Sequence, residues 1–227
     1  MPGSSWRWTV RSTSETTATE MKKKIRILIV DDHAILRVGL ATLLNTYSDF
    51  TVIDEAESGA IALRKVTQLQ PDVVILDLLM PGMDGVETTT RLIRDNPNTR
   101  ILILSTFGTS DGISHALEAG ARGAILKNAD IGELETAIRT VARGERFVSS
   151  ELVRIMKEDP PVQDLTPRQQ EILGSLVRGL TSVDIAKELR ISSDMVREHT
   201  SALFKKLGAA NRAEAVAIAL RKHLLKT

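Results

Sequence analysis

The sequence contains no cysteine, few aromatic residues and no long apolar run, and each absence excludes a class of protein. Without cysteine the chain can form neither a disulfide nor a thiolate zinc site, and nothing in it requires an oxidising compartment. No apolar stretch approaches the roughly 20 residues that span a bilayer, and the first twenty residues lack the apolar core of a secretory signal. We therefore expect a cytoplasmic protein with no membrane partner.

Nucleotide-binding loops of the types GxxxxGK[ST] and GxGxxG are also missing, which disfavours a nucleotide-binding α/β domain. The net charge is only +1, so the average predicts no polyanionic partner. From residue 164 onward, however, the chain carries eleven basic and seven acidic side chains. This modest basic excess is compatible with phosphate binding but is common on other surfaces too.

The 227 residues exceed the commonest single-domain size, and 42% apolar content suffices for ordinary cores, so we expect two domains. Short β-branched apolar runs alternate with segments of helical period, a pattern typical of βα units around a parallel sheet, and the later part is helical throughout. We predict an α/β fold, a doubly wound five-stranded parallel sheet, followed by a small all-α domain. The boundaries are a disordered extension at 1–20, the α/β domain at 21–147, a linker at 148–162 and the helical domain at 163–227, with strands near 25–30, 50–56, 73–76, 101–104 and 124–126.

Polar side chains follow four of these strands directly. Asp31 and Asp32 follow the first strand, Asp77 the third, Ser105 the fourth and Lys127 the fifth. Because the carboxyl ends of parallel strands meet at one edge of the sheet, we expect these side chains to converge there. Clustered carboxylates repel one another unless a cation joins them, and a hard divalent ion such as Mg²⁺ suits oxygen ligands.

The chemistry that suits this set is phosphoryl transfer onto a carboxylate, in which positioning and charge neutralisation supply most of the catalysis. Asp77 is the best nucleophile, since the paired Asp31 and Asp32 are better suited to holding the metal. Lys127 and the metal would hold phosphoryl oxygens, and Ser105 would bond a third. For any single aspartate, capping of the following helix is an equally good explanation, but it explains the whole set poorly.

The runs ILIVDDH, VVILDLLMPGMDG, ILILS and GARGAILK resemble the receiver domain of bacterial two-component response regulators over about residues 24–145. The resemblance implies that a histidine kinase phosphorylates Asp77. It also implies that Asp31, Asp32 and the Leu79 carbonyl, beside Asp77, bind Mg²⁺. Ser105 and Lys127 would then complete the switch.

Two residues near this site are interpreted separately. The receiver family usually has an aromatic residue that reorients with the Ser or Thr, and Ala124 stands at its position. Without that ring, we expect the two states of the domain to be less distinct. His33, beside the acidic pair, is interpreted as the solvent-facing start of the first helix rather than as a phosphate donor.

Beyond the linker, two short helices at 181–189 and 193–207 are separated by a tight turn, which predicts a helix-turn-helix. In such a unit the second helix enters the major groove of DNA. Apolar side chains define the face of the second helix that we expect to be buried: Val196, Leu203, Phe204 and Leu207. A packed pair of surface helices without DNA binding would show a similar pattern.

The segments LTPRQQEIL, KKLG and NRAEAV resemble the C-terminal domain of LuxR-type regulators of the NarL/FixJ group, over about residues 163–225. The resemblance implies that one group of residues reads DNA bases and contacts phosphates. It also implies that the helix containing Val216 and Ala217 is used for dimerisation. Departures at Val183, Met195 and Glu198 mean that the DNA sequence preference does not carry over. The expected DNA-binding residues, within and just after the helix-turn-helix at about 182–201, are Ser182, Arg197, Glu198, His199, Ser201, Lys205 and Lys206.

These patterns predict a response regulator in which phosphorylation of Asp77 controls dimerisation and sequence-specific binding to double-stranded DNA. The implied partners are a sensor histidine kinase, a second copy of the chain when phosphorylated, and RNA polymerase. We expect no enzyme acting on an external substrate, because Leu79 stands where a phosphohydrolase would carry a second aspartate. A Mg²⁺-dependent phosphohydrolase and a phosphorylation-independent interaction module remain the alternatives.

Overall fold

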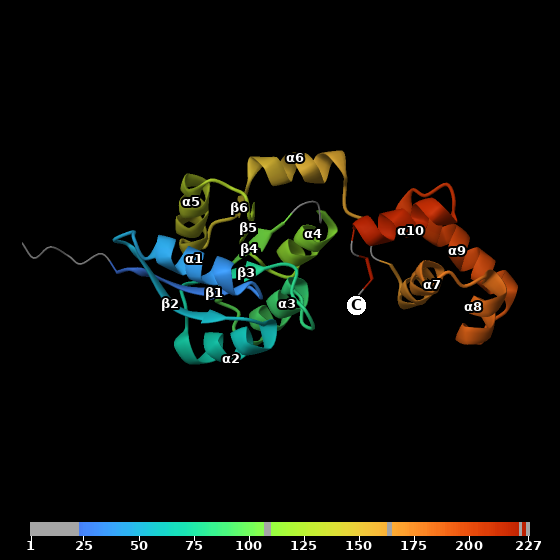
Figure 1. Cartoon of the computed structure of the whole chain (residues 1–227), viewed down its shortest axis with the longest axis horizontal. Helices are drawn as coiled ribbons and strands as arrows, with labels where there is room; N and C mark the ends of the chain where they lie inside the picture. The colour runs from blue at the N-terminus through green and yellow to red at the C-terminus, as the bar shows by residue number, and fades with distance from the viewer. Residues whose placement is uncertain (1–22, 107–109, 163–164, 223, 226–227) are drawn as a thin grey trace, which may run out of the picture.

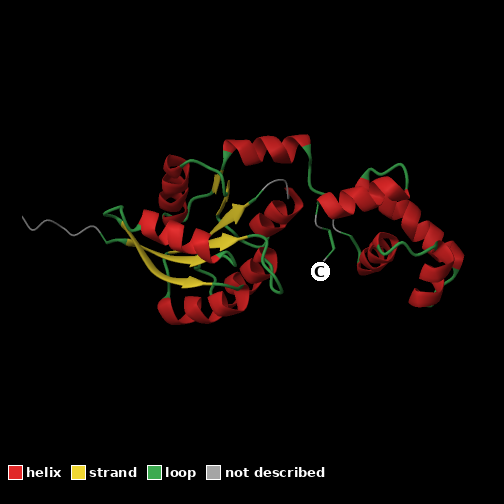
Figure 2. Ribbon diagram, viewed as in Figure 1, coloured by secondary structure: helices red, strands yellow, loops and turns green. Residues whose placement is uncertain are grey.

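The computed structural model describes residues 23–106, 110–162, 165–222 and 224–225. The disordered extension predicted at residues 1–20 therefore lies outside the described residues. Within the described ranges, no helix has the length and apolar content needed to cross a membrane. The chain forms an α/β domain followed by a wholly helical domain (Figures 1 and 2).

The α/β domain alternates strands and helices, as the apolar runs predict. Its sheet is parallel throughout, in the order β2-β1-β3-β4-β5-β6. The five predicted strands are confirmed. The elements are β1 (Ile25–Val30), α1 (Ala34–Leu44), β2 (Phe50–Ala56), α2 (Gly59–Leu69), β3 (Val73–Asp77), α3 (Gly85–Asp95), β4 (Ile101–Ser105), α4 (Ser110–Glu118), β5 (Gly123–Leu126), α5 (Ile131–Ala142), β6 (Phe147–Val148) and α6 (Ser150–Glu158).

Both faces of the sheet are covered, because successive side chains of each strand point to opposite sides. Leu28 and Val30 pack with α2, α3 and α4 in one core, whereas Ile27 and Ile29 pack with α1 and α5 in the other. All four of these strand residues are buried. The unbroken apolar run of β1 therefore reflects burial on two faces rather than an amphipathic strand.

A sixth strand and a helix extend the domain into the segment predicted as a linker. In β6, Val148 pairs with Ala124 of β5, and Ser149 donates a backbone hydrogen bond to the Ala124 carbonyl. Leu152 of α6 is fully buried in the same core as Ala124. The residue that replaces the family's usual aromatic is thus covered by the chain that leaves the domain.

The helical domain has its own core and sharply defined helix ends. Thr166 and Gln169 form a capping box. Gly179 follows the first helix two residues after its last residue, Gly208 caps the third helix, and both glycines have positive φ. Asn211 caps the last helix through its side chain, which accepts a hydrogen bond from the Glu214 backbone N–H. The elements are α7 (Pro167–Val177), α8 (Ser182–Leu189), α9 (Ser193–Leu207) and α10 (Arg212–Arg221).

Gly85 lets the start of α3 approach the end of β3 closely. Its backbone N–H donates to the Leu78 carbonyl at 2.9 Å. A Cβ at this position would lie 2.5 Å from the Asp77 carbonyl oxygen and 2.7 Å from the Leu78 Cα. These neighbours are backbone atoms, so the helix itself would have to move.

We predict that Gly85→Ala destabilises the α/β domain by about 2 kcal/mol, because overpacking against backbone is not relieved by side-chain rotation. Gly39→Ala is the matched control: Gly39 lies inside α1 and a Cβ there meets nothing within 4 Å. That control should stabilise the domain by roughly 0.5–1 kcal/mol through higher helix propensity. Urea unfolding followed by circular dichroism compares the two variants, and equal effects would contradict the steric explanation.

Candidate phosphoacceptor site and nucleic-acid interface

Three carboxylates meet at the carboxyl edge of the sheet. Val30 and Leu76 are paired in register on the adjacent strands β1 and β3, which brings the residues that follow them, Asp31 and Asp77, side by side. Oxygen atoms of Asp31, Asp32 and Asp77 lie within 4.8 Å of one another. Strand order reverses between β1 and β3, the position where open α/β sheets bind ligands.

Lys127 bridges the two buried carboxylates. Its Nζ lies 2.7 Å from Asp31 Oδ2 and 2.8 Å from Asp77 Oδ2. The Lys127 backbone N–H donates to the Ser105 carbonyl at 2.7 Å, so the end of β4 fixes the position of the Lys127 backbone. The predicted convergence of Asp31, Asp77 and Lys127 is therefore observed.

Burial and charge shift the ionisation of this group in defined directions. Burial raises the pKa of Asp77 above its usual value and the charge of Asp31 adds to this, whereas the hydrogen bond from Lys127 acts against both. Burial opposes the positive charge of Lys127, but its hydrogen bonds to Asp31 and Asp77 outweigh burial and raise the pKa of Lys127. The ionised carboxylates thus depend on a cation.

Ser105 and Leu79 flank the carboxylates. The buried Ser105 ends β4, and its Oγ donates to the Thr106 carbonyl at 2.8 Å. The Leu79 N–H lies 3.3 Å from Asp77 Oδ1, so the loop after β3 folds back over the phosphoacceptor candidate. Ser105 lies at the predicted edge, and a role for the Leu79 carbonyl as a metal ligand stays a prediction.

Two basic side chains near the acidic pair were not part of the predicted site. His33 is exposed, as expected at the start of α1, but its Nδ1 lies 2.8 Å from Asp32 Oδ1 and 3.1 Å from Asp31 Oδ1. Arg37, one turn later, donates from Nη1 to the Asp31 carbonyl at 2.6 Å and approaches Glu55. Their spacing of four residues on one helix face was the available sequence signal.

The oxygen-rich donor set fits a hard divalent cation. Asp31 and Asp77 are buried, Asp32 is partly exposed, and their mutual proximity requires more positive charge than Lys127 alone carries. Oxygen ligands at a partly open position are what Mg²⁺ prefers. The exposed side of Asp32 gives such an ion access to water and to a phosphoryl group.

The helix-turn-helix of the second domain presents a polar surface over an apolar base. Val196, Leu203 and Leu207 of α9 are buried, as predicted, and Phe204 is only partly buried. Predicted DNA-binding residues that are exposed are Ser182, Arg197, Glu198, Ser201 and Lys205, whereas His199 and Lys206 are partly buried.

A groove of about 450 Å³ runs between the start of α8 and the side of α9. Four predicted DNA-binding residues line it: Ser182, Arg197, Ser201 and Lys205. Thr200 and the Ala209–Ala210 pair after α9 also line it and were missed, because small residues give no charge signal. Glu198, His199 and Lys206 are not among the lining residues. In this structure, the guanidinium of Arg197 pairs with Asp194 one turn earlier.

Known proteins match both domains. Residues 27–139 match the family described as the response regulator receiver domain, and residues 163–219 match the family described as bacterial regulatory proteins, luxR family. The transcriptional regulatory protein LiaR of Bacillus subtilis (strain 168) is 35% identical over 209 residues, covering 88% of this chain and 99% of LiaR. The response regulator protein VraR of Staphylococcus aureus (strain NCTC 8325 / PS 47) is 35% identical over 207 residues, covering 89% and 99%.

Solved structures agree with these matches. The crystal structure of the response regulator ChrA, from a heme-sensing two-component system, is 35% identical with a TM-score of 0.54, covering 89% of this chain and 99% of ChrA. RcsB of Salmonella enterica serovar Typhimurium, bound to promoter P1flhDC in the presence of the phosphomimetic BeF3−, has a TM-score of 0.68 at 24% identity, covering 88% and 99%. At that identity RcsB supports the fold alone. With these full-length relatives, the chain belongs to the NarL/FixJ group of two-component response regulators, which join a receiver domain to a LuxR-type helix-turn-helix DNA-binding domain.

Proposed function

We propose that Asp77 accepts a phosphoryl group from a sensor histidine kinase, and that the phosphorylated chain pairs with a second copy and binds specific sites on double-stranded DNA. An oxygen of the Asp77 carboxylate attacks phosphorus, the P–N bond of the phosphohistidine breaks, and the imidazole leaves with the bonding electrons and takes up a proton. The acyl phosphate is the product. The observation that carries this proposal is the buried Asp77 carboxylate, held by Lys127 2.8 Å away at the sheet edge.

The other residues have supporting roles. Asp31 and Asp32, with Asp77 and the Leu79 carbonyl, are the proposed ligands of Mg²⁺, which when bound would neutralise charge on the phosphoryl oxygens. Lys127 holds a second phosphoryl oxygen, and the Ser105 hydroxyl leaves the Thr106 carbonyl to bond a third. In this proposal the Ser105 hydroxyl exchanges its hydrogen bond to the Thr106 carbonyl for one to the phosphoryl group.

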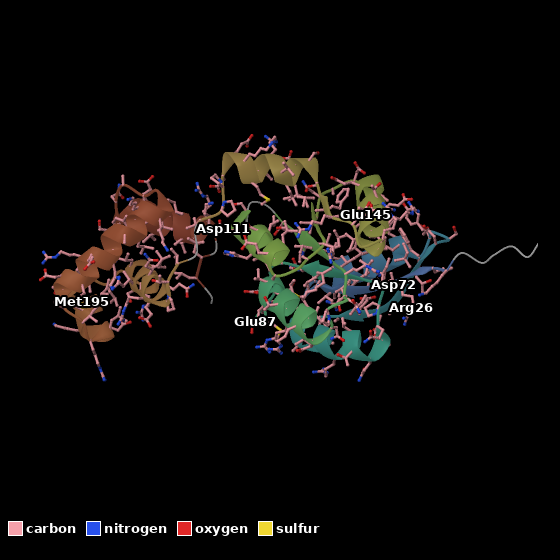
Figure 3. All side chains as sticks on the ribbon, turned by 180° about the vertical axis from the view of Figure 1, so that it is seen from behind. Arg26, Asp72, Glu87, Asp111, Glu145 and Met195 are labelled. Atoms are coloured by element: carbon pink, nitrogen blue, oxygen red, sulfur yellow. The ribbon has the colours of Figure 1, made fainter. Side chains whose placement is uncertain are left out.

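The proposed DNA-binding role depends on α9. Figure 3 shows Met195, in the first turn of α9, at the end of the helical domain away from the receiver. The predicted reading residue Arg197 is exposed on the same helix. A regulator with this surface acts where the chromosome lies, so we propose a cytoplasmic location. Contact with RNA polymerase stays a prediction.

We predict that Asp77→Asn abolishes stable phosphoryl incorporation from labelled acetyl phosphate, because an amide oxygen cannot form the acyl phosphate. Asp95→Asn is the matched control, since Asp95 is an exposed aspartate at the end of α3 that pairs with Arg94. The control should incorporate label as the wild type does. Equal labelling of the Asp77→Asn variant would place the phosphoacceptor elsewhere.

We predict that Asp32→Asn weakens Mg²⁺ binding by about tenfold or more, because affinity for hard cations follows the number of charged oxygen ligands. Isothermal titration calorimetry with MgCl₂ measures this directly. Asp54→Asn, which removes a carboxylate that pairs with Lys65 away from the site, should leave the affinity unchanged. Chelation of divalent ions should also stop labelling of the wild type. If both variants bind Mg²⁺ equally well, Asp32 is not a ligand.

We predict different effects from two basic residues of the groove. Arg197→Ala should weaken binding to the specific site by about 1–3 kcal/mol and relax selectivity at one base pair, as expected for a base-reading arginine. Lys205→Ala should weaken binding to all sequences similarly and reduce the salt dependence by about one counterion.

The sites for this comparison come from genome-wide footprinting of the wild type beside Asp77→Asn, which reports targets and phosphorylation dependence together. Fluorescence anisotropy at several salt concentrations then separates the two effects. Unchanged specific affinity for Arg197→Ala removes this residue from the reading set. Absence of DNA binding in every phosphorylation state would favour the interaction-module alternative.

A further inference from the structure

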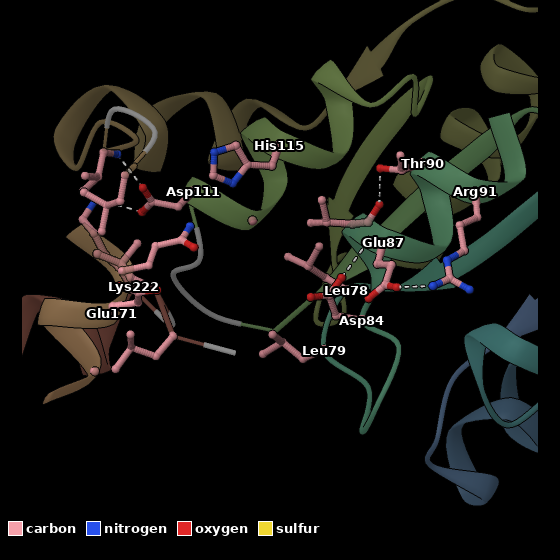
Figure 4. Close-up of a pocket in the computed structure, with 18 of the residues that line it drawn as sticks. Leu78, Leu79, Asp84, Glu87, Thr90, Arg91, Asp111, His115, Glu171 and Lys222 are labelled. Carbon is pink, nitrogen blue, oxygen red and sulfur yellow. Dashed lines mark hydrogen bonds and ion pairs between the residues drawn. The ribbon is translucent and has the colours of Figure 1, made fainter. Parts of the chain in front are cut away.

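A buried ion pair joins the receiver to the end of the DNA-binding domain. Asp111 lies in the first turn of α4, and Lys222 directly follows α10. Their side chains are only 3% and 4% exposed, and Lys222 Nζ lies 3.1 Å from Asp111 Oδ2. Figure 4 shows the two residues meeting across the junction between the domains.

The linker closes around the same pair. Lys222 Nζ also lies 2.9 Å from Asp159 Oδ1 and donates to the Pro160 carbonyl at 2.8 Å. Ser110 Oγ lies 3.4 Å from the same Nζ, so four acceptors, Asp111 included, surround the three N–H donors of the ammonium group. The other oxygen of Asp111 accepts the backbone N–H of Val162. Receiver, linker and helical domain are therefore tied at one buried point.

Around this point the junction is loosely packed. A cavity of about 1060 Å³ opens between α3 and α4 of the receiver and α7 of the helical domain. Its walls include Glu87 and His115 on one side and Glu171 and Gly174 on the other (Figure 4). Across this open gap the helices make little close apolar contact, so the buried ion pair is a main determinant of how the domains are oriented. Replacing one partner of such a pair while the other stays buried leaves an uncompensated charge, so loss of either residue should disfavour this arrangement of the domains.

The ion pair is also connected to the phosphoacceptor. Gly112, next to Asp111, packs directly against Leu78: a Cβ on Gly112 would lie 3.0 Å from Leu78 Cδ2. Leu78 immediately follows Asp77 and is buried. Since Gly112 leaves no side chain to absorb a displacement, a shift of the backbone at Asp77 reaches the first turn of α4.

We propose that the Asp111–Lys222 ion pair is an interdomain latch that holds the two domains in one orientation until phosphorylation of Asp77 moves α4 and releases it. The latch rests on the proposed function. It does not cover the recognition helix, because Met195 lies at the far end of the helical domain (Figure 3) and Arg197 is exposed. It controls orientation, which matters because the two DNA-binding domains of a dimer must reach successive half-sites together.

The experiment measures the distance between the domains in the full chain. Because the sequence has no cysteine, Gln68→Cys on α2 and Lys187→Cys on α8, both exposed positions, provide two unique sites for spin labels. We expect one narrow distance distribution by electron–electron double resonance in the unphosphorylated protein. Lys222→Met and Asp111→Asn should each broaden and lengthen it.

Two controls separate the latch from general effects. Arg154→Met removes an equally direct but exposed ion pair, with Glu151 on α6, and should leave the distribution narrow. The double variant Asp111→Asn with Lys222→Met should open the protein no further than Lys222→Met alone, because the lysine substitution already removes the contact with Asp111. Each domain has its own core, so neither latch variant should alter the circular dichroism spectrum.

The second part of the experiment tests the effect of phosphorylation on the distance between the domains. Acetyl phosphate with Mg²⁺ should shift the wild type to the distribution of the latch variants, and the variants themselves should change little. The latch proposal is wrong if the spin-labelled Lys222→Met variant keeps the narrow distance distribution. It is also wrong if the spin-labelled wild type keeps a narrow distribution after phosphorylation. Failure of Asp77 to incorporate phosphate would instead overturn the proposed function, while the variants would still open the unphosphorylated chain.

Discussion

The contact of Lys127 with Asp31 and Asp77 is the interaction on which the receiver site depends. Two buried carboxylates face each other because β1 and β3 are neighbours in register, and neither can be ionised there without a cation. Lys127 reaches them from the end of β5, across the intervening β4. With Asp32 included, three carboxylates face one ammonium group, and the remaining negative charge favours a divalent ion.

This part of the molecule could be predicted from sequence because it follows from strand order and strand ends alone. Apolar β-branched runs predict strands covered on both faces, and residues that directly follow parallel strands meet at one edge. Asp77 and Lys127 are therefore brought together whatever the helices do. The contacts of His33 and Arg37 could not be predicted in the same way, since they depend on how α1 is rotated over the sheet.

The contacts that connect the two domains could not be predicted from the sequence for a different reason. A strand of two residues, Phe147–Val148, carries too short a pattern to be recognised, so the predicted boundary between domain and linker falls inside it. A lysine at the end of a helix is ordinarily explained by the favourable field of the helix carbonyls. Lys222 differs only in being buried against Asp111, which is distant in the sequence. Burial of a charge is a tertiary property that local pattern does not contain.

These features together explain how a receiver can act without the usual aromatic residue. A rotating ring on β5 transmits a change at the edge of the sheet, but here Ala124 is covered by β6 and by Leu152 of α6. That edge is therefore closed to a moving side chain. On the other side of the site, Leu78 follows Asp77 and packs against Gly112 at the start of α4. In the proposed latch, the signal leaves the site through displacement of α4, which carries Asp111, rather than through rotation of a ring on β5.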